Sequence, residues 1–373
     1  MSFALDIVPP IIQAEGALDG LGAHAARLAA GRPLLLVADP GLAALGITEA
    51  ARAALRRAGL DVTIFEGFAS DPTLAQIDDA AAAARGANAG LVVAIGGGSA
   101  LDVGKAAAAI AAGAEVADYY RLCANPLPAG PLAKICIPTT SGTGSEATRT
   151  VVATDGAGAK TWLWGAEIKA DLILLDPALT TSLPPGLTGA TAVDAMVHAM
   201  EACTNRAASV GNDLYCHAAI RLVAQHLPVV MDRPGDIAAR AGLQFAACLA
   251  GIAIDNAGTA LAHCIGHAIG SLAHIHHGRA VAVAMRGTIG WISADDPDGR
   301  FAAVAALLGD DLAAGFDRMV RTAGIPLALP GIGAEALAEL MAAPENAPMR
   351  NATRRAITDA DLAMLARMVL EQN

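Results

Sequence analysis

Histidines gather in one short stretch of this 373-residue chain. Five of its nine histidines lie between residues 263 and 278, in the run HCIGHAIGSLAHIHHG. They are His263, His267, His274, His276 and His277. The first two are one helical turn apart, so both can point from one face of a helix toward a common partner. Because neutral imidazole is a common metal ligand, this stretch is a candidate metal site.

A second polar group precedes the histidines. In the run TAVDAMVHAMEA, Asp194, His198 and Glu201 form one polar stripe on an otherwise apolar helix. A carboxylate and several imidazoles from two helices can bind one ion, and this donor set suits Fe(II), Zn(II) or Mn(II) rather than Ca²⁺ or Mg²⁺. Spacing alone does not select the ligands. Two alternatives also remain: Asp194 can cap a helix behind Thr191, and a buried histidine can be an ordinary core residue.

A glycine-rich run, GGGSALDVGK at residues 96–105, follows an expected buried strand and opens an expected helix. Its glycines allow a close backbone approach, and the unpaired N–H groups of a helix N-terminus can hold a phosphate. The run lacks the G-x-G-x-x-G spacing. The alternative is a plain turn in which Ser99 caps the helix and Asp102 completes a capping box.

A second polar loop, PTTSGTGSEAT at residues 138–148, follows the next expected strand. Its hydroxyl groups and glycines can bind a pyrophosphate or a sugar, although the loop can also be an exposed turn. Asp39 ends the first expected strand, where its carboxylate can accept hydrogen bonds from the ribose of NAD and repel the 2′-phosphate of NADP. Together the loops favour a dinucleotide, but Asp39 precedes the glycine run, the reverse of the usual Rossmann order.

The elements that must position these residues change in type near the middle of the chain. Up to about residue 175, short apolar runs alternate with helical ones, which predicts a parallel sheet with helical crossovers. The expected strands are 34–38, 62–66, 90–95, 134–138, 150–154 and 172–175, and the expected helices are 48–57, 73–85 and 101–112. The segment DPALTTSLPP, 176–185, is the expected domain boundary.

Beyond that boundary the sequence predicts only helices. Alanine-rich runs with helical periodicity cover 190–203, 210–226, 236–254, 260–271, 281–292 and the tail from 359. The segment 326–348 is expected to be an irregular connection between helices. The fold class is therefore an α/β N-terminal domain, residues 1–182, followed by an all-α C-terminal domain, residues 183–373.

Composition excludes several classes of function. The net charge of −11 argues against binding to nucleic acid or to an anionic membrane surface. Mean hydropathy is high, at +0.47, but the apolar runs at 86–101 and 241–255 are too short or too interrupted to span a bilayer. The first ten residues do not resemble a signal peptide, and six scattered cysteines suit buried thiols, so we expect a cytoplasmic protein.

These motifs, in this order, resemble those of the iron-containing (group III) alcohol dehydrogenases over about three quarters of the chain. The resemblance implies the two-domain plan that dehydroquinate synthase also has, with NAD(H) and a divalent metal, Fe(II) first and Zn(II) second, in a cleft between the domains. It also implies a homodimer or a higher homo-oligomer. By this pattern the metal ligands are Asp194, His198, His263 and His277, and His267 is the expected proton relay.

The resemblance also assigns the cofactor residues. They are Asp39, Gly97, Gly98, Ser99, Asp102, Thr139, Thr140, Thr143, Val151 and Lys160. His274 and His276 are additional to the pattern. The chain departs from the family at Asp71, where relatives often have Asn, and at Arg279 and Arg286, which can hold a substrate carboxylate or can form pairs elsewhere.

The implied reaction is hydride transfer between nicotinamide and a small primary alcohol or aldehyde. An ω-hydroxy acid is an alternative substrate because of the two arginines. A metal-free enzyme similar to maleylacetate reductase does not need the complete set of one aspartate and three histidines. A lyase similar to dehydroquinate synthase needs more basic residues for its substrate, and no sequence feature supports a non-catalytic NAD sensor.

Overall fold

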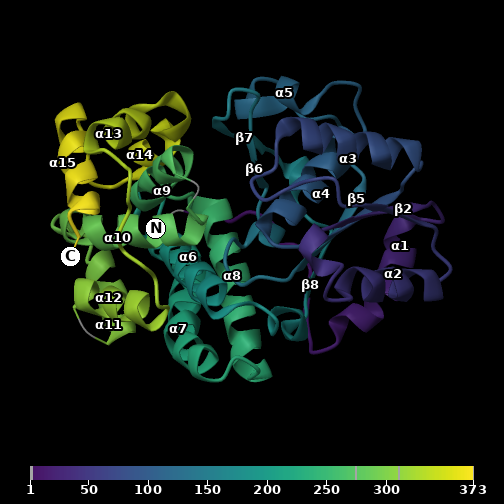
Figure 1. The fold of residues 1–373 in the computed structure, drawn as a ribbon, viewed down its shortest axis with the longest axis horizontal. Helices are drawn as coiled ribbons and strands as arrows, with labels where there is room; N and C mark the ends of the chain where they lie inside the picture. Colours follow the sequence, from purple (N-terminus) through teal and green to yellow (C-terminus); the bar gives the residue numbers. More distant parts are fainter. Residues whose placement is uncertain (1–2, 274, 310, 373) are drawn as a thin grey trace. The chain divides into compact units, whose positions relative to one another are not determined.

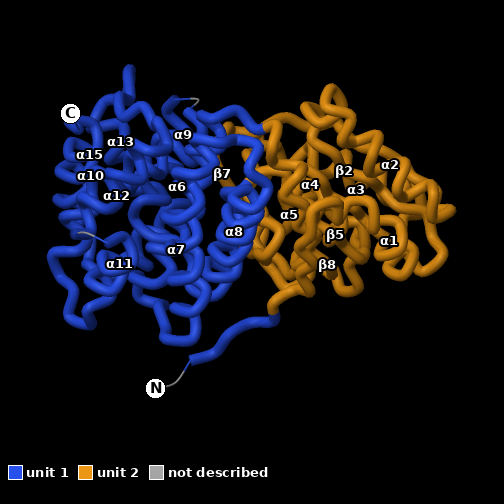
Figure 2. Tube along the Cα trace, turned by 90° about the horizontal axis from the view of Figure 1, so that it is seen from below, with its two compact units in different colours: residues 1–7, 141–144, 183–373 blue, residues 8–140, 145–182 orange. Residues whose placement is uncertain are grey.

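The computed structural model describes residues 3–273, 275–309 and 311–372. The chain divides into two compact units, coloured separately in Figure 2. We call residues 8–140 and 145–182 the α/β unit, and residues 1–7, 141–144 and 183–373 the helical unit. The main change from one unit to the other, between Ser182 and Leu183, lies inside the expected boundary segment.

A six-stranded parallel sheet forms the centre of the α/β unit (Figure 1). In spatial order its strands are β1 (Ile11–Gln13), β8 (Leu172–Leu175), β5 (Ala133–Pro138), β4 (Leu91–Gly96), β2 (Leu34–Ala38) and β3 (Val62–Phe65). Every residue of β2, β4 and β8 is buried, because helices cover both faces of the sheet. Successive side chains of β2 therefore enter different cores: Leu35 and Val37 one, Leu34 and Leu36 the other.

Two pairs of helices supply those cores. One core contains residues of α3 (Leu74–Gly86) and α4 (Gly98–Ile110), and the other contains residues of α1 (Leu21–Ala29) and α2 (Ile47–Arg57). The short helix α5 (Ala117–Tyr120) follows α4. Gly104 lets α4 lie close to the sheet, since a Cβ atom there would be 2.5 Å from the Cβ atom of Ala94 on β4.

One predicted strand lies outside the main sheet. β6 (Thr150–Thr154) pairs with β7 (Lys160–Trp164) in an antiparallel hairpin that was not predicted from the sequence. The turn between them is held by Asp155, whose carboxylate accepts hydrogen bonds from the backbone N–H groups of Ala157 and Ala159. Such side-chain bonds are typical of Asp in tight turns, so this short segment makes a hairpin rather than a crossover.

The described residues of the helical unit from 185 onward form helices and their connections, as the sequence predicts, although the helices at 300–308 and 312–322 lie outside the predicted ranges. The helices of this unit are α6 (Pro185–Thr204), α7 (Val210–Asp232), α8 (Ile237–Ala257), α9 (Leu261–Leu272), α10 (His277–Ser293), α11 (Arg300–Leu308), α12 (Leu312–Thr322), α13 (Ala334–Ala342), α14 (Ala347–Ala352) and α15 (Asp359–Leu370). The expectation of an irregular segment at 326–348 is wrong in part, because α13 and the start of α14 lie inside it. The central helix α6 packs against α7, α8 and α10, which explains why nearly all of its side chains are buried.

Helix α8 is long and strongly apolar. With 21 residues and a mean hydropathy of 1.7 in its most apolar part, it could cross a membrane by length and composition alone. Within the helical unit, however, 67% of that part is buried, where α8 packs against α6 and α7. Its hydropathy is therefore that of a core helix.

Five of the six cysteines are buried, and Cys123 is exposed.

Candidate functional site

Four side chains of the helical unit converge on one point. Asp194 and His198 come from α6, His263 from α9 and His277 from the first position of α10. One ligand atom from each lies within 4.8 Å of all the others. Three of these side chains are almost fully buried, whereas 38% of the His277 side chain is exposed. This is the same set that the family pattern selects from the sequence.

The atoms at the centre of this cluster lack hydrogen-bond partners. Oδ1 of Asp194 lies 3.8 Å from Nε2 of His263 and 3.7 Å from Nε2 of His277, too far for hydrogen bonds. Among the described residues, neither this oxygen nor Nε2 of His263 has another partner. A buried polar atom left unpaired costs about 1–3 kcal/mol, and a cation bound between these atoms would remove that cost. The donors therefore fit a metal ion.

The electrostatics of the cluster also suit a cation. Burial, with the nearby charge of Glu201, raises the pKa of Asp194 to about 8. Burial lowers the pKa of His263 to about 3, and burial together with the His263 imidazole holds the pKa of His198 well below its usual value. The imidazoles are therefore neutral, with lone pairs free to bind. One oxygen and three nitrogens form a donor set that suits Fe(II) or Zn(II).

Helix packing positions these ligands. Because α6 begins at Pro185, Asp194 lies well inside the helix, and the alternative that it caps the helix behind Thr191 is wrong. The Thr191 hydroxyl instead donates to the carbonyl of Leu187. The start of α10 lies against α6 at Gly278, where a Cβ atom would be 2.4 Å from the carbonyl oxygen of Ala190. Only glycine allows this approach, which brings His277 next to Asp194.

The remaining histidines of the stretch lie in different surroundings. The ring of His267 is half-buried on α9, and its centroid lies 5.4 Å from that of His277. His276 is exposed just before α10 and makes no side-chain cap. His274 lies outside the described residues. His267 is thus next to the cluster without being one of its four members.

In the α/β unit, the glycine run forms a tight connection from β4 to α4. Gly96 has φ of +149°, and a Cβ atom there would be 2.6 Å from Ala100 and 2.8 Å from the Cβ of Asp39. Gly97 is the N-cap residue and, having no side chain, does not cap the N–H groups of the first turn. The capping-box alternative is therefore wrong: Ser99 lies inside the helix, where its hydroxyl accepts a hydrogen bond from the backbone of Asp71. Free N–H groups at this turn suit a phosphate.

Three predicted cofactor segments meet at one edge of the sheet. β2, β4 and β5 are neighbours, so the residues after their carboxyl ends lie side by side. The backbone N–H of Asp39 donates to Ile95, and that of Thr139 donates to Gly96. A Cβ atom at Gly97 would touch the side chain of Thr140 at 3.4 Å. The structure thus brings Asp39, the glycine run and the two threonines together.

Two residues of the glycine run have internal roles. Asp102 accepts hydrogen bonds from the Ser145 hydroxyl and from the backbone of Val152, so its carboxylate is occupied within the protein. Lys105, which the sequence did not single out, is fully buried. Its Nζ donates to the carbonyls of Ser145 and Thr150 at 2.7 and 2.8 Å. Both side chains therefore position the polar loop after β5.

The other predicted cofactor residues are placed differently. Lys160 on β7 forms an ion pair with Asp71 at 2.5 Å, close to Ser99 at the start of α4. The side chain of Val151 is fully buried in a hydrophobic core, so only its backbone can contact a ligand. Thr143 belongs to the segment 141–144, which is part of the helical unit and not of the sheet edge.

Comparisons with known proteins agree with this geometry. The sequence profile described as "Iron-containing alcohol dehydrogenase" matches residues 9–177, and the profile of its C-terminal domain matches residues 188–367. The chain belongs to the iron-containing alcohol dehydrogenase family. Members of this family are NAD-dependent oxidoreductases that act on CH–OH groups, and the metal and NAD(H) predicted from the sequence are confirmed at this level.

Several proteins resemble this alcohol dehydrogenase over most of their length. Long-chain-alcohol dehydrogenase 1 of Geobacillus thermodenitrificans (strain NG80-2) is 36% identical over 348 residues, which cover 89% of this chain and 87% of that protein. The NAD-dependent methanol dehydrogenase of Bacillus methanolicus is 33% identical over 82% of this chain and 80% of its own. The crystal structure of a 1,3-propanediol oxidoreductase has a TM-score of 0.90 and 28% identity, and covers 99% of this chain and 100% of its own.

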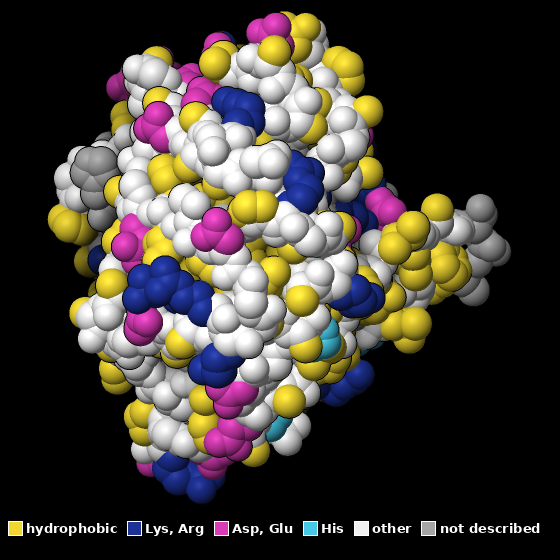
Figure 3. Space-filling view, turned by 90° about the vertical axis from the view of Figure 1, so that its right-hand side faces the viewer, with side chains coloured by type: hydrophobic (Ala, Val, Ile, Leu, Met, Phe, Trp, Pro, Cys, Tyr) yellow, Lys and Arg dark blue, Asp and Glu magenta, His cyan; other side chains and the backbone are white. Residues whose placement is uncertain are grey.

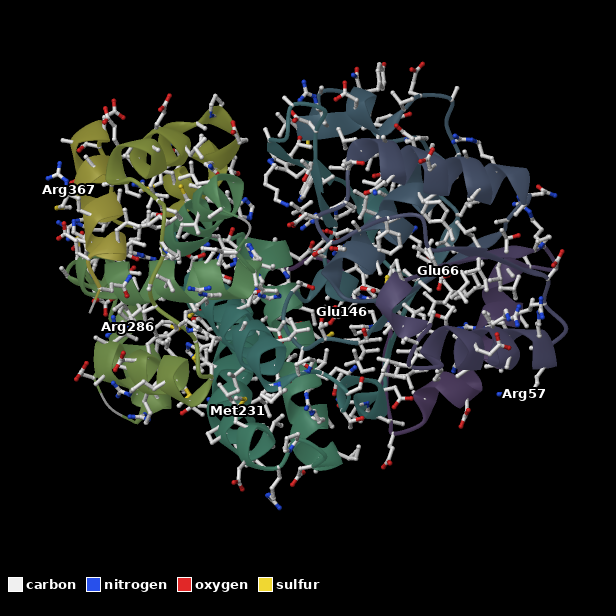
Figure 4. The ribbon with its side chains drawn as sticks, in the orientation of Figure 1. Arg57, Glu66, Glu146, Met231, Arg286 and Arg367 are labelled. Atoms are coloured by element: carbon white, nitrogen blue, oxygen red, sulfur yellow. The ribbon has the colours of Figure 1, made fainter. Side chains whose placement is uncertain are left out.

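The two arginines of this alcohol dehydrogenase have partners that do not suggest substrate binding. Arg286, labelled in Figure 4, pairs with Asp317 at 2.7 Å and also donates to Gln372. Arg279 donates to the backbone carbonyls of Pro326 and Ala328. Both guanidinium groups therefore hold helices and loops of the helical unit together. The hypothesis that they bind a substrate carboxylate loses its support.

Proposed function

We propose that this protein reduces short aldehydes, and oxidises the matching primary alcohols, with NAD(H) and a divalent metal held by Asp194, His198, His263 and His277. The observation that carries the proposal is the pair of unpartnered atoms, Oδ1 of Asp194 and Nε2 of His263, at the centre of a buried donor set. The donor set of one oxygen and three nitrogens suits both Fe(II) and Zn(II). Fe(II) is the first choice because the family is iron-containing.

The roles of the protein's own residues follow from their placement. When bound, the metal ion supplies Lewis-acid polarisation of the substrate's oxygen. His267 lies next to His277 and is half-buried, so its imidazole can pass the alcohol proton to solvent. Bound in the α/β unit, NAD⁺ would supply the hydride acceptor for alcohol oxidation and NADH the hydride donor for aldehyde reduction. The neutral imidazoles of the cluster keep their lone pairs available near neutral pH.

The α/β unit is proposed to bind the dinucleotide. The free N–H groups after Gly97 and Gly98, with Ser99, Thr139 and Thr140, suit the pyrophosphate. Lys160 adds a positive charge near the same turn, beside Asp71. Asp39 lies at the adjacent strand end, where its carboxylate suits a ribose with two free hydroxyls. Asp102 then acts by positioning the loop after β5.

The substrate class is inferred from the names of the relatives and from the contacts of Arg279 and Arg286. The relatives named above act, by their names, on long-chain alcohols, methanol and 1,3-propanediol. With Arg279 and Arg286 occupied elsewhere, no observation favours an ω-hydroxy acid. Four converging ligand atoms likewise argue against a metal-free enzyme similar to maleylacetate reductase.

The experiment compares wild-type protein with the Asp194→Asn variant on aldehydes of increasing chain length, following NADH oxidation. Replacing the carboxylate with an amide keeps its shape and removes the negative ligand, so we expect metal content to fall and kcat/KM to drop at least 100-fold. Asp213→Asn removes a different carboxylate of the helical unit, the partner of Arg300, and controls for lost charge. Full activity in Asp194→Asn would refute the ligand set.

We also propose a cytoplasmic homodimer that acts on small molecules and not on nucleic acid or membranes. Basic and acidic side chains lie interspersed on the face shown in Figure 3, and the net charge is −11. Self-association is what the family resemblance described above implies. Sedimentation of the purified protein would test it, because a dimer has twice the mass of the 37.4 kDa chain.

A further inference from the structure

Glu201 has no place in the proposed ligand set, although it belongs to the same polar stripe of α6. Its side chain is only 2% exposed, and both of its oxygens are hydrogen-bonded. Oε1 accepts the backbone N–H of Ala262 at 2.6 Å, and Oε2 accepts that of Ala260 at 2.7 Å. Oε2 also lies 2.7 Å from Nδ1 of His263. This carboxylate therefore contacts a ligand residue without pointing at the ligand cluster.

These contacts determine which nitrogen of His263 carries the proton. Backbone N–H groups only donate, so both oxygens of Glu201 act as acceptors, and the short contact to Nδ1 is best made by an N–H on the ring. A neutral imidazole protonated at Nδ1 has its lone pair on Nε2. That atom is the one that faces Oδ1 of Asp194 at 3.8 Å and has no partner among the described residues.

The same carboxylate fixes the start of the helix that carries His263. No side chain of its own caps α9, because Ala260 occupies the position before its first residue. Glu201 reaches across from α6 and takes two of the N–H groups that this end of α9 leaves unpaired. One buried group thus holds both the helix and the imidazole ring at fixed positions.

We propose that Glu201 is a positioning residue that sets the tautomer and orientation of His263 for metal binding. The inference rests on the proposed function, since it takes His263 to be a ligand. A carboxylate behind a metal-bound histidine raises the basicity of the ring and removes its rotational freedom. The carboxylate is not among the converging ligand atoms, and both of its oxygens accept hydrogen bonds from α9 and the residue before it.

The test measures Zn(II) affinity of the full chain, stripped of metal and titrated against a fluorescent chelator. Glu201→Gln replaces one acceptor oxygen with an NH₂ group that faces N–H donors, so we expect affinity to fall about 10- to 100-fold. Thr204→Val is the matched control, a buried polar residue on the same helix whose hydroxyl donates to the carbonyl of Met200. Its affinity should stay within about twofold of wild type.

A third variant distinguishes failure of the proposed ligand set from failure of the role given to Glu201. His263→Ala should lose most of its Zn(II) affinity if the proposed ligand set is right. Unchanged affinity in His263→Ala would refute the ligand set itself. If His263→Ala binds weakly but Glu201→Gln binds like wild type, the ligand set stands and the role given to Glu201 is overturned.

A measurement on unmodified protein covers the case in which Glu201→Gln does not fold. Long-range ¹H–¹⁵N spectra of metal-free wild-type protein, with His263 assigned by its absence in His263→Ala, report which ring nitrogen is protonated. We expect the proton on Nδ1, which is the less common tautomer of free histidine. A proton on Nε2 would overturn the proposal, because a positioning role through Glu201 requires the lone pair on that atom.

Discussion

At the scale of single residues, Asp39 is the side chain that we propose selects between NAD and NADP. Its Oδ1 accepts a hydrogen bond from Gly41, and the residue lies beside the glycine run. A carboxylate at this place repels a 2′-phosphate, and like charges placed together cost several kcal/mol. If Asp39 contacts the ribose, as we propose, the site should favour NAD over NADP.

Replacing Asp39 should change cofactor preference. We expect Asp39→Gly to shift the ratio of kcat/KM for NADH and NADPH toward NADPH by about tenfold or more, or about 1.4 kcal/mol per factor of ten. Asp39→Asn keeps an acceptor for Gly41 and removes only the charge, so it should shift the ratio in the same direction. Unchanged kinetics with both cofactors, in both variants, would refute the role given to Asp39.

A second residue, Glu146, should make the free energy of unfolding depend on pH. Burial raises the pKa of this carboxyl, labelled in Figure 4, from 4.5 to about 7. Below about pH 4.5 the carboxyl is protonated in both folded and unfolded chains. Between pH 4.5 and 7 the unfolded chain loses the proton and the folded chain keeps it, so stability falls by about 3 kcal/mol and then stays level.

Glu146→Gln removes this titration. Relative to wild type, we expect the free energy of unfolding of the variant to rise between pH 4.5 and 7 and to level off above that range. Denaturant unfolding at pH 5 and pH 8 measures the difference, and Glu115→Gln, at an exposed carboxylate, is the control. A gain of the same size at both pH values would contradict the prediction.

The residue types that bind metal could be predicted from the sequence, but their partners could not. Spacing placed Asp194 and His198 on one helix face, yet it could not choose among five histidines; the family pattern made that choice. Asp102 was assigned to the cofactor, and the structure gives its carboxylate protein partners. A polar side chain's type shows what it can bind, whereas its partner depends on contacts far along the chain.

At the scale of helices and strands, Gly278 couples α10 to α6. A Cβ atom there would be 2.4 Å from the Ala190 carbonyl and 3.2 Å from the Cβ of Asp194. Gly278→Ala should therefore push α10 away, cost about 1–3 kcal/mol of stability and weaken Zn(II) binding at least tenfold. Gly290, on the same helix, has open space around its Cβ position, so Gly290→Ala should be neutral or stabilise by up to about 1 kcal/mol.

Thermal melts and Zn(II) titrations of both glycine variants check this prediction. If Gly278→Ala bound metal as tightly as Gly290→Ala, the close approach of the two helices would not be what positions His277.

Strands and helices with a clear hydrophobic pattern could be predicted from the sequence, and most of the short ones could not. The buried strands are continuous apolar runs and the longest helices are alanine-rich, so these elements were predicted, although the predicted end of α7 falls six residues short. Helices α1, α11 and α12 were not predicted. The three-residue strand β1 and the β6–β7 hairpin carry too little pattern, and pairing in the hairpin depends on the turn that Asp155 stabilises. Helix α13 was missed because prolines and glycines surround it.

At the scale of the whole molecule, the sequence changes from mixed strands and helices to helices alone where the α/β unit ends and the helical unit begins. One short segment is an exception. Residues 141–144 belong to the helical unit although they lie within the N-terminal half. Gly144 explains this, because a Cβ atom there would be 2.5 Å from Gly251 on α8. Such a contact between two glycines leaves no signal in composition or periodicity.

The central claim, that the buried cluster holds a metal needed for turnover, is tested most directly by removing and restoring that metal. Protein stripped by a chelator should not oxidise NADH with short aldehydes, and Fe(II) or Zn(II) added without oxygen should restore the activity. Activity that survives complete stripping, verified by elemental analysis, would contradict the claim and favour a metal-free reductase.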